Sequence, residues 1–274
     1  MNFSVIAAVN NEQVLQQCLL SSPDLQIQNV GEVLLQRGFD NAADAYNTAI
    51  AQAKCEVLVF VHQDIYLPAG WFEQMAAVIN QLALTDPDWG VLGVYGVTAA
   101  GEPRGHLYCN ANQCTLGQPV QAPLEVGTLD EVILIIRKNS GLQFDRGLKG
   151  FHLYGTDICL TAREQGRKIY VVPGFCIHNA NGYGMFPTSF WRGYLHMRRK
   201  WKSRLPVKTP CIEIKQSLWP VLRSMVWRFC WLKTKRIKLA RRVSDPAKLY
   251  TELKTDLASK AQCVSHDLMR ANNL

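Results

Sequence analysis

The sequence predicts an α/β protein built around a mostly parallel sheet, and three observations lead to this class. Short apolar runs at residues 3–9, 57–61 and 132–136 have the length and composition of buried strands. Helical patterns at residues 13–20 and 42–53 separate the first strands, and such alternation is typical of parallel strands joined by crossover helices. With 274 residues and 48% hydrophobic composition, the chain can also bury a full core.

The first predicted strand ends on Asn10, Asn11 and Glu12, at the turn into the first helix. Polar groups at such a turn can contact a nucleotide, and they are equally ordinary as a helix cap. A weak strand is predicted at residues 30–33, before the Ala-rich helix at residues 42–53. The residue types alone leave both roles of the turn open.

The strand at residues 57–61 ends abruptly on His62-Gln63-Asp64. In open α/β sheets, ligands bind beyond the carboxyl ends of the strands. A carboxylate and an imidazole two residues apart at such an end could hold a divalent metal and, through it, a diphosphate. A strand capped by polar residues where it meets solvent explains the same pattern equally well.

The rest of the chain continues the alternation, with a helix at residues 71–84, strands at 90–94, 132–136 and 169–172, and a helix beginning near Ile158. No Gly-x-Gly-x-x-Gly follows the first strand, and no P-loop motif occurs anywhere. These absences argue against a dinucleotide dehydrogenase and against a P-loop nucleotidase. The sheet is therefore predicted to be a nucleotide platform of another kind.

Three sequence blocks occur in a fixed order over about residues 1–205. They are SVIAAVNNE at residues 4–12, Asn47 with FVHQD at residues 60–64, and residues 129–182, which contain YGTDICL. In this pattern the chain resembles the family-2 inverting glycosyltransferases of the GT-A fold, and is most similar to the branch described as glycosyltransferase-like. Three blocks in order are far more specific than any single motif.

The resemblance implies a nucleotide-sugar donor, UDP- or GDP-linked, whose diphosphate is bridged by Mg²⁺ or Mn²⁺. An acceptor hydroxyl, on a glycan or a lipid-linked sugar, would attack the anomeric carbon in line and invert it. The metal stabilises the charge that develops on the leaving nucleotide diphosphate. A carboxylate takes the proton of the attacking hydroxyl.

The resemblance also implies metal ligands. Asp64 stands at the last position of the family's Asp-x-Asp motif, and His62 replaces the first, which suits Mn²⁺ better than Mg²⁺. His178 could add a third ligand, although a loop histidine near glycines is the plainer interpretation. The residues expected near the nucleotide are Asn10, Asn11, Glu12, Asn47 and His62.

The acid–base position departs from the family, because Tyr154-Gly155 stands where relatives carry an acidic pair. Asp157 is the first choice for the base, and a helix N-cap is an equal alternative role for it. Asp130 and Glu131 are further candidates. If no carboxylate reaches the acceptor, the chain would be a weak or inactive relative that binds glycans or membranes. A nucleotidyltransferase is a second rival, but it should carry a Gly-rich basic loop after the first strand, which is missing here.

The positive charge of the chain is concentrated in one block. Residues 192–242 hold 16 Lys or Arg and one acid, a net charge of +15, whereas the rest of the chain has a net charge of −7. Apolar positions at residues 218–232 recur at three and four, marking one face of a helix too short to span a bilayer. Such a block could bind nucleic acid, lie on an anionic membrane, or be a solvated helical face. We favour the membrane surface, since many such transferases have lipid-linked or cell-surface acceptors; nucleic acid is unlikely.

These patterns together predict two parts: a GT-A-like glycosyltransferase domain over residues 1–205 and a basic, Trp-rich helical extension over 206–274, whose last helix starts near Asp245. Nine cysteines without Cys-x-x-Cys pairs are consistent with reduced, buried thiols. The first residues already form a strand pattern and not a signal peptide. A cytoplasmic protein, peripheral on the inner face of a membrane, is therefore expected.

Overall fold

The computed structural model describes residues 1–27, 30–182, 186–223, 226 and 240–255. A large central sheet contains β1 (Phe3–Val9), β2 (Glu32–Arg37), β3 (Val57–Val61), β5 (Val91–Gly93), β10 (Leu124–Glu125), β12 (Ile133–Arg137) and β13 (Ile169–Val171). Its order is β10-β13-β5-β12-β3-β1-β2. β12 is antiparallel to both its neighbours and β10 to β13, so five of these seven strands point the same way. The predicted class, an α/β fold with a mostly parallel sheet, is confirmed.

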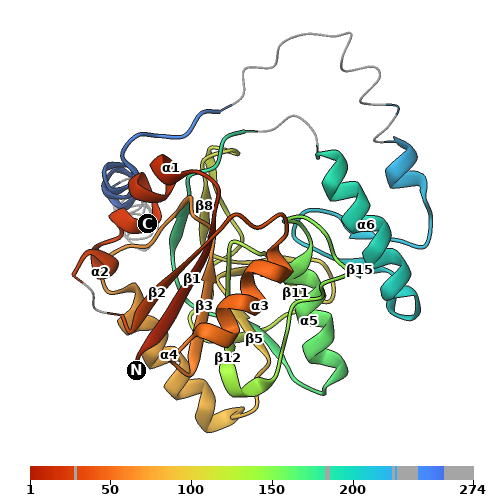
Figure 1. Cartoon of the computed structure of the whole chain (residues 1–274), viewed down its shortest axis with the longest axis horizontal. Helices are drawn as coiled ribbons and strands as arrows, with labels where there is room; N and C mark the ends of the chain where they lie inside the picture. The colour runs from red at the N-terminus through yellow and green to blue at the C-terminus, as the bar shows by residue number, and fades with distance from the viewer. Residues whose placement is uncertain (28–29, 183–185, 224–225, 227–239, 256–274) are drawn as a thin grey trace, which may run out of the picture.

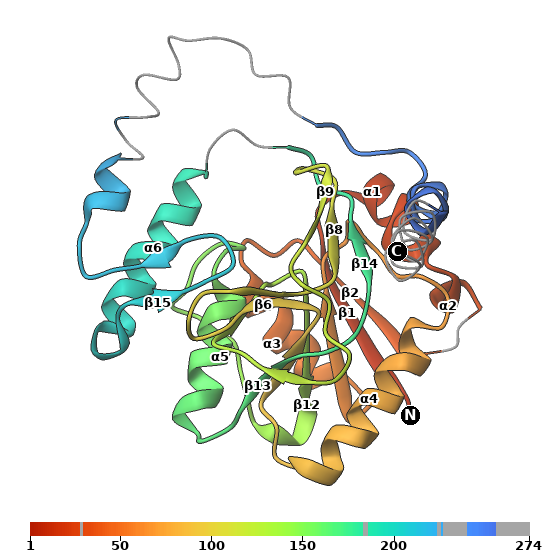
Figure 2. The same cartoon turned by 180° about the vertical axis from the view of Figure 1, so that it is seen from behind.

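The helices up to Lys200 are α1 (Glu12–Gln17), α2 (Pro23–Gln26), α3 (Ala42–Gln52), α4 (Trp71–Thr85), α5 (Tyr154–Glu164) and α6 (Thr188–Lys200), with 3₁₀ turns at Leu19–Ser21, Lys138–Ser140 and Lys202–Arg204. α3 and α5 cover one face of the central sheet, and α4 covers the other (Figures 1 and 2). α3 begins where the Asn41 side chain accepts a hydrogen bond from the Asp44 N–H at 2.9 Å.

The strands of the sheet send alternate side chains to two separate hydrophobic cores. In β3, Leu58 and Phe60 join the core under α3 and α5, while Val59 and Val61 join the core under α4. Both faces of β3 are therefore covered, which explains why the strand is apolar throughout and not alternating. Packing in the two cores holds the strands in place, and with them the positions at which the following loops begin.

Three smaller sheets lie beside the central one. The first, in the order β4-β14-β8-β9, contains β4 (Ile65–Tyr66), β14 (Cys176–His178), β8 (Leu107–Cys109) and β9 (Cys114–Leu116). The others contain β6 (Tyr95–Val97), β7 (Pro103–Gly105) and β11 (Thr128–Leu129), and β15 (Val207–Lys208) with β16 (Glu213–Ile214). β14 pairs with β4 so that His178 lies opposite Ile65. This register brings His178 next to the end of β3.

Two of the differences from the predicted element boundaries bear on the candidate site. The weak strand predicted at residues 30–33 is β2, which runs to Arg37 because its parallel pairing with β1 continues that far, from Ser4–Glu32 to Val9–Arg37. α5 begins at Tyr154 and not near Ile158, directly after Leu153, whose φ of +67° is left-handed. The first turn of α5 therefore contains the positions that depart from the family pattern.

The C-terminal part of the chain is described in pieces. A helix starts after Asp245 as predicted, with the Asp245 carboxylate accepting a hydrogen bond from the Lys248 N–H at 2.9 Å. The predicted amphipathic helix at residues 218–232 falls largely outside the described residues. Within the described part of the chain, no helix is long and apolar enough to cross a membrane. The division into domains at residue 205 stays a prediction.

A candidate active site at the carboxyl edge of the sheet

The carboxyl ends of three neighbouring parallel strands, β1, β2 and β3, meet at one edge of the sheet. β12 runs in the opposite direction, so its amino end lies at this same edge, where the His62 N–H donates to the Val132 carbonyl at 3.1 Å. Residues before β12, including Asp130 and Glu131, are thereby brought to the ends of the parallel strands. This edge is where a doubly covered sheet binds ligands.

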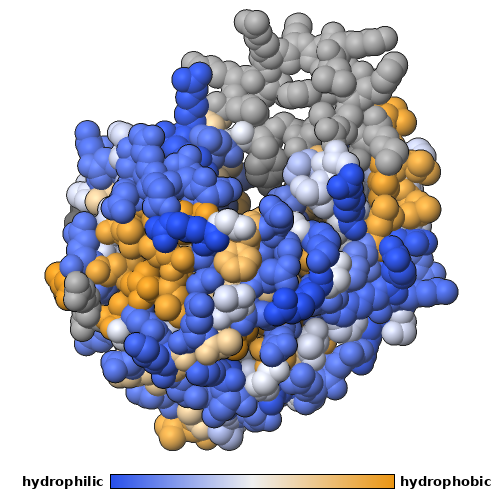
Figure 3. All heavy atoms as spheres, in the orientation of Figure 1, coloured by the Kyte–Doolittle hydropathy of each residue, from blue (hydrophilic) through white to orange (hydrophobic). Residues whose placement is uncertain are grey.

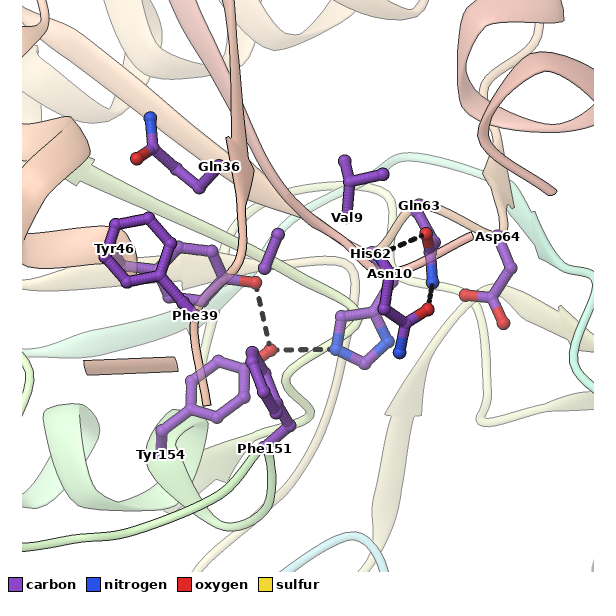
Figure 4. A pocket seen from close by; sticks show the side chains of 11 residues that line it. Val9, Asn10, Gln36, Phe39, Tyr46, His62, Gln63, Asp64, Phe151 and Tyr154 are labelled. Atoms are coloured by element: carbon purple, nitrogen blue, oxygen red, sulfur yellow. Dashed lines mark hydrogen bonds between the residues drawn. The ribbon is translucent and has the colours of Figure 1, made fainter. Parts of the chain in front are cut away.

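A pocket with about 630 Å³ of open space occupies this edge (Figure 4). Its lining residues come from the ends of β1, β2 and β3, from α3, and from the segment that leads into α5: Ala8, Val9, Asn10, Gln36, Phe39, Tyr46, His62, Gln63, Asp64, Phe151 and Tyr154. In Figure 4 the aromatic rings and Gln36 lie on one side of the pocket, and Asn10, Gln63 and Asp64 lie on the other. Such a mixture of apolar walls and a few polar groups is typical of small-molecule sites.

Three potential metal ligands converge beside this pocket. Ligand atoms of His62, Asp64 and His178 all lie within 4.8 Å of one another. The closest pair is His178 Nε2 and Asp64 Oδ1, 3.4 Å apart. Two imidazoles and one carboxylate form a donor set that suits Mn²⁺ and other first-row divalent ions. All three residues were candidates from the sequence, and the pairing of β14 with β4 brings His178 to the other two.

A second layer of contacts orients the histidine at the end of β3. The Tyr154 hydroxyl lies 2.8 Å from His62 Nε2 and 3.4 Å from the Tyr46 hydroxyl, as Figure 4 shows. This contact engages one ring nitrogen of His62 and leaves the other for a ligand. Outer partners of this kind fix the ring orientation of metal-binding histidines.

The charges in this cluster compensate one another. Burial raises the pKa of the Asp64 carboxyl, but His178, His62 and Arg242 together hold it well below its ordinary value. Burial lowers the pKa of His178, and the Asp64 carboxylate outweighs it and raises that pKa to about 10. Burial lowers the pKa of His62 to about 4. Asp64 is thus ionised between two cationic neighbours, His178 and Arg242, and His178 would release its proton on binding a metal.

The turn after β1 has the structural role of a cap and also faces the pocket. The Asn11 side chain accepts a hydrogen bond from the Val14 N–H at 3.0 Å and caps α1. The backbone N–H groups of Asn10 and Asn11 both donate to Gln63 Oε1 at 3.1 Å. Glu12 instead pairs with Arg37 on the surface. Of the three residues predicted near a nucleotide at this turn, only Asn10 is among those that line the pocket.

Two other residues predicted for the site lie away from the pocket lining. Asn47 bonds the backbone of Phe144 through both its amide atoms and ties α3 to that segment. Asp157 is buried, and its carboxylate accepts hydrogen bonds from Trp201 Nε1 at 2.7 Å and from Lys200 Nζ at 2.9 Å. Their predicted roles toward nucleotide and acceptor stay predictions.

The two carboxylates before β12 have raised pKa values. Burial raises the pKa of Asp130, whose Oδ1 accepts from the Val132 N–H at 3.0 Å. Burial and the neighbouring Asp130 raise the pKa of Glu131 to about 8. The Glu131 carboxylate lies at the amino end of α5, 3.5 Å from the Gly155 nitrogen and 3.9 Å from His152 Nδ1.

The glycine at position 155 is what lets Glu131 lie there. A Cβ atom on Gly155 would come within 3.1 Å of the Cα and Cβ atoms of Glu131. A larger residue at position 155 would therefore require the Glu131 backbone to shift by a few tenths of an ångström. The departure from the family motif is accompanied by a carboxylate from the adjacent segment.

Several pocket residues were missed by sequence reasoning. Gln36 follows from the true end of β2, which the weak strand pattern placed four residues too early. Phe39 and Phe151 sit in loops whose composition carries no signal for a ligand wall. Arg242 contacts Asp64 at 2.9 Å although 178 residues separate them, and only the fold could bring them together.

Comparisons with known proteins agree with this geometry. A family model described as "Glycosyltransferase like family" matches residues 4–184. Among solved structures, GalNAc-T7 with UDP, GalNAc and Mn²⁺ aligns with a TM-score of 0.52 at 12% identity, over 74% of this chain and 48% of that one. TarS residues 1–349 from S. aureus with UDP-GlcNAc aligns with a TM-score of 0.51 at 18% identity, over 76% of this chain and 67% of that one. Both likenesses concern the fold.

A curated relative is 27% identical over 166 residues, which cover 57% of this chain and 64% of the relative. It is the protein named "ATP synthase subunits region ORF 6" from Fuscovulum blasticum. The match thus spans less than two thirds of that protein, as the alignment with GalNAc-T7 spans about half of that chain.

Proposed function

This chain belongs to the glycosyltransferase-like family, and we propose that it transfers a sugar from a nucleotide-sugar donor to an acceptor hydroxyl, with inversion and with a divalent metal. The observation that carries the proposal is the convergence of His62, Asp64 and His178 beside a pocket at the carboxyl edge of the sheet. A nucleoside would lie in the pocket, and its diphosphate would reach the three metal ligands.

The donor is proposed to be a UDP-sugar, with a GDP-sugar as the alternative. Support comes from GalNAc-T7 and TarS, which share the fold and were solved with UDP and UDP-GlcNAc respectively. In this chain Phe39 and Phe151 offer apolar surfaces for a planar base, and Gln36 and Asn10 offer amide groups for hydrogen bonds. The amides of Asn10 and Gln63 bond each other at the end of the pocket nearer to Asp64.

The metal would be held by His62, Asp64 and His178, with Mn²⁺ preferred because two of the three ligands are imidazoles. Once bound, such an ion offsets the negative charge that develops on the leaving nucleoside diphosphate. The surrounding residues keep the ligands in place: Tyr154 orients the His62 ring, and the strand pairing of β14 with β4 fixes His178.

We assign the general base to Glu131 and not to the first choice from the sequence, Asp157. The Asp157 carboxylate is buried and already bonded to Lys200 and Trp201, whereas the Glu131 side chain is 20% exposed. A pKa of about 8 makes the Glu131 carboxylate a strong proton acceptor that still ionises near neutral pH. It would accept the acceptor's hydroxyl proton as oxygen attacks the anomeric carbon. Asp130, the other candidate, would then raise the basicity of Glu131 by its proximity.

A relative that binds donor or glycan without transferring sugar is the second candidate. It is favoured by Gly155, which stands where the family carries an acidic residue. An active transferase would release nucleoside diphosphate from a bound donor, and a relative that only binds would not.

Contact with the cytoplasmic face of a membrane is a further part of the proposal, with a lipid-linked sugar as acceptor. Leu218, Trp219, Leu222 and Val226 are exposed, and Trp219 is 66% exposed; an orange patch at the right edge of Figure 3 covers this part of the chain. Arg198, in the last turn of α6, donates from Nε to the Gln216 carbonyl at 2.7 Å, two residues before Leu218. Exposed apolar side chains next to basic ones are suited to an anionic lipid surface. Sedimentation with anionic vesicles, compared for the native chain and Trp219→Ser, measures this contact.

The experiment that tests the donor site is thermal stabilisation by a panel of nucleoside diphosphates and nucleotide sugars, with and without Mn²⁺. A ligand at about 100 times its dissociation constant adds about 2.7 kcal/mol to the free energy of unfolding. We expect a Mn²⁺-dependent shift with uridine nucleotides that Asp64→Ala abolishes. A native chain that no nucleotide stabilises would contradict the proposal.

A further inference from the structure

The segment at residues 240–243 lies beside the candidate site, although it is far from the site residues in the sequence. It is held by four backbone contacts: Gly182 N–H to the Ala240 carbonyl at 2.8 Å, the Arg242 N–H to Asn181 Oδ1 at 2.9 Å, and a pair between Val243 and the Asn179 amide at 2.9 and 2.8 Å. The segment therefore lies along the residues that directly follow β14.

Two buried amides depend on this segment for hydrogen bonds. Asn110 and Asn179 are each only 1% exposed. Asn110 Nδ2 donates to the Arg241 carbonyl at 2.8 Å, and Asn179 bonds Val243 through both its amide atoms. Leaving buried amide groups without partners would cost free energy, so the position of the segment is part of the fold.

The segment points one guanidinium at the metal cluster. Arg242 Nη2 donates to Asp64 Oδ2 at 2.9 Å, and Arg242 Nε donates to the Asn179 carbonyl at 2.9 Å. The other carboxylate oxygen, Asp64 Oδ1, is the one that faces His178. Arg242 thus occupies one oxygen of Asp64 and leaves the other to face the cluster.

We propose that Arg242 is a donor-binding residue, which orients Asp64 and binds the diphosphate of the donor; this rests on the proposed function. The guanidinium has five N–H groups, and its contacts with described residues use two of them. Its side chain is 31% exposed, so the remaining groups are accessible. Guanidinium groups bind phosphate oxygens in a fork geometry that an ammonium group cannot reproduce.

Charge gives this proposal a characteristic signature. A guanidinium next to the metal ligands repels a lone divalent cation, whereas it attracts the complex of that cation with a nucleoside diphosphate, whose net charge is negative. Removing Arg242 should therefore leave Mn²⁺ binding alone unchanged or tighter. The same change should weaken the binding of a nucleoside diphosphate in the presence of Mn²⁺.

The test is isothermal titration of the full chain with Mn²⁺ alone and with UDP at saturating Mn²⁺, for native protein, Arg242→Ala and Arg242→Lys. Loss of a charged hydrogen bond predicts UDP binding about 10- to 100-fold weaker in Arg242→Ala, with partial recovery in Arg242→Lys. Arg241→Ala is the matched control, because it removes the same charge from an exposed neighbour whose backbone carbonyl makes the contact with Asn110. Its UDP affinity should stay close to native.

Other outcomes would overturn the proposal in different ways. Tighter binding of both Mn²⁺ and UDP in Arg242→Ala would make the residue an inhibitor of the site. If Arg242→Ala bound Mn²⁺ and UDP as the native chain does but melted at a lower temperature, Arg242 would serve only to stabilise the fold. A native chain that binds no UDP, GDP or nucleotide sugar at all would instead remove the proposed function itself.

Discussion

The two sides of the candidate site treat their carboxylates in opposite ways. On the metal side, Asp64 lies between His178 and Arg242, and its pKa is held low. On the acceptor side, Asp130 and Glu131 have no ion pair with a lysine or arginine among the described residues, and burial raises the pKa of both. The same functional group is thus prepared for two tasks by its surroundings: a permanent anion that holds a cation, and a base that takes a proton.

The largest effect is expected from removing the negative charge of Asp64 on the metal side. Asp64→Asn keeps the size of the side chain and removes the charge that holds a cation. We expect the release of nucleoside diphosphate from a nucleotide sugar to fall by about 10³- to 10⁴-fold, since the electrostatic help of a metal is worth several kcal/mol. Steady-state assays over a Mn²⁺ series measure the change. If Asp64→Asn regained full activity at high Mn²⁺ concentration, Asp64 would not be needed for catalysis, and the prediction would be wrong.

Removing the charge of Glu131, on the acceptor side, should leave the binding of the donor unchanged. Glu131→Gln keeps the shape of the side chain and removes its ability to accept a proton, so kcat should fall by about 10²-fold or more while donor affinity stays near native. The matched control is Asp157→Asn, which alters the carboxylate bonded to Lys200 and Trp201. If that variant loses kcat at native stability and Glu131→Gln does not, the base is Asp157.

The pH dependence sharpens the contrast, because the two sides should titrate at different ends of the scale. With the pKa of Glu131 at about 8, kcat/KM should rise about tenfold per pH unit up to about pH 8 and then level off. A rate that is flat between pH 6 and 8 would argue against Glu131.

Glu131 should also make the stability of the fold depend on pH, and stability should fall as the pH rises, whereas kcat/KM should increase. Its pKa is raised above the ordinary 4.5, so the folded chain holds the proton more tightly than the unfolded chain. The resulting stabilisation is complete below pH 4.5 and is lost as the pH rises through about 8. Urea denaturation of native protein and Glu131→Gln at several pH values separates this contribution, which the variant should lack.

The smallest expected effect concerns the glycine that makes room for Glu131. Gly155→Ala places a Cβ within 3.1 Å of the Glu131 backbone and should cost about 1–3 kcal/mol of unfolding free energy. Gly193→Ala in α6 is the matched control, since its nearest neighbour would be a side-chain atom at 3.5 Å. A helix interior gains about 0.5–1 kcal/mol from Ala over Gly, so this control should be neutral or stabilising. Equal stability of both variants would contradict the tight contact at Gly155.

Much of the fold could be predicted because its signals are local. The run at residues 57–61 is apolar since both its faces are covered, and it is followed by His62 and Asp64, two of the three candidate metal ligands. The α/β class followed from strands alternating with helices, and the family from ordered blocks. His178 was a weaker candidate, because its place depends on β14 pairing with β4 and no local pattern specifies that pairing.

Side-chain roles were less predictable, because polar residues have structural uses that a sequence does not distinguish from functional ones. Asn11 caps α1, and Asn47 ties α3 to Phe144, although both sit near expected ligand positions. Arg242 lay in a block whose charge suggested a surface, and its contact with Asp64 depends on amides at positions 110 and 179. Polar contacts between residues far apart in the chain leave no periodic pattern in the sequence, so they could not be predicted from it.

The hydrogen bond between Gly182 and Ala240 also bears on how such a chain can evolve. It closes a loop over residues 183–239, and the entropic penalty of closing a loop rises by only about 0.6 kcal/mol when its length doubles. Insertions between these two points would therefore leave Arg242 beside Asp64. The elements of this span that pack into the core, from Phe190 in α6 to Val221, would have to be kept, so changes of length would be tolerated only after Val221. Truncation before residue 240, by contrast, would remove a donor-site side chain along with the tail.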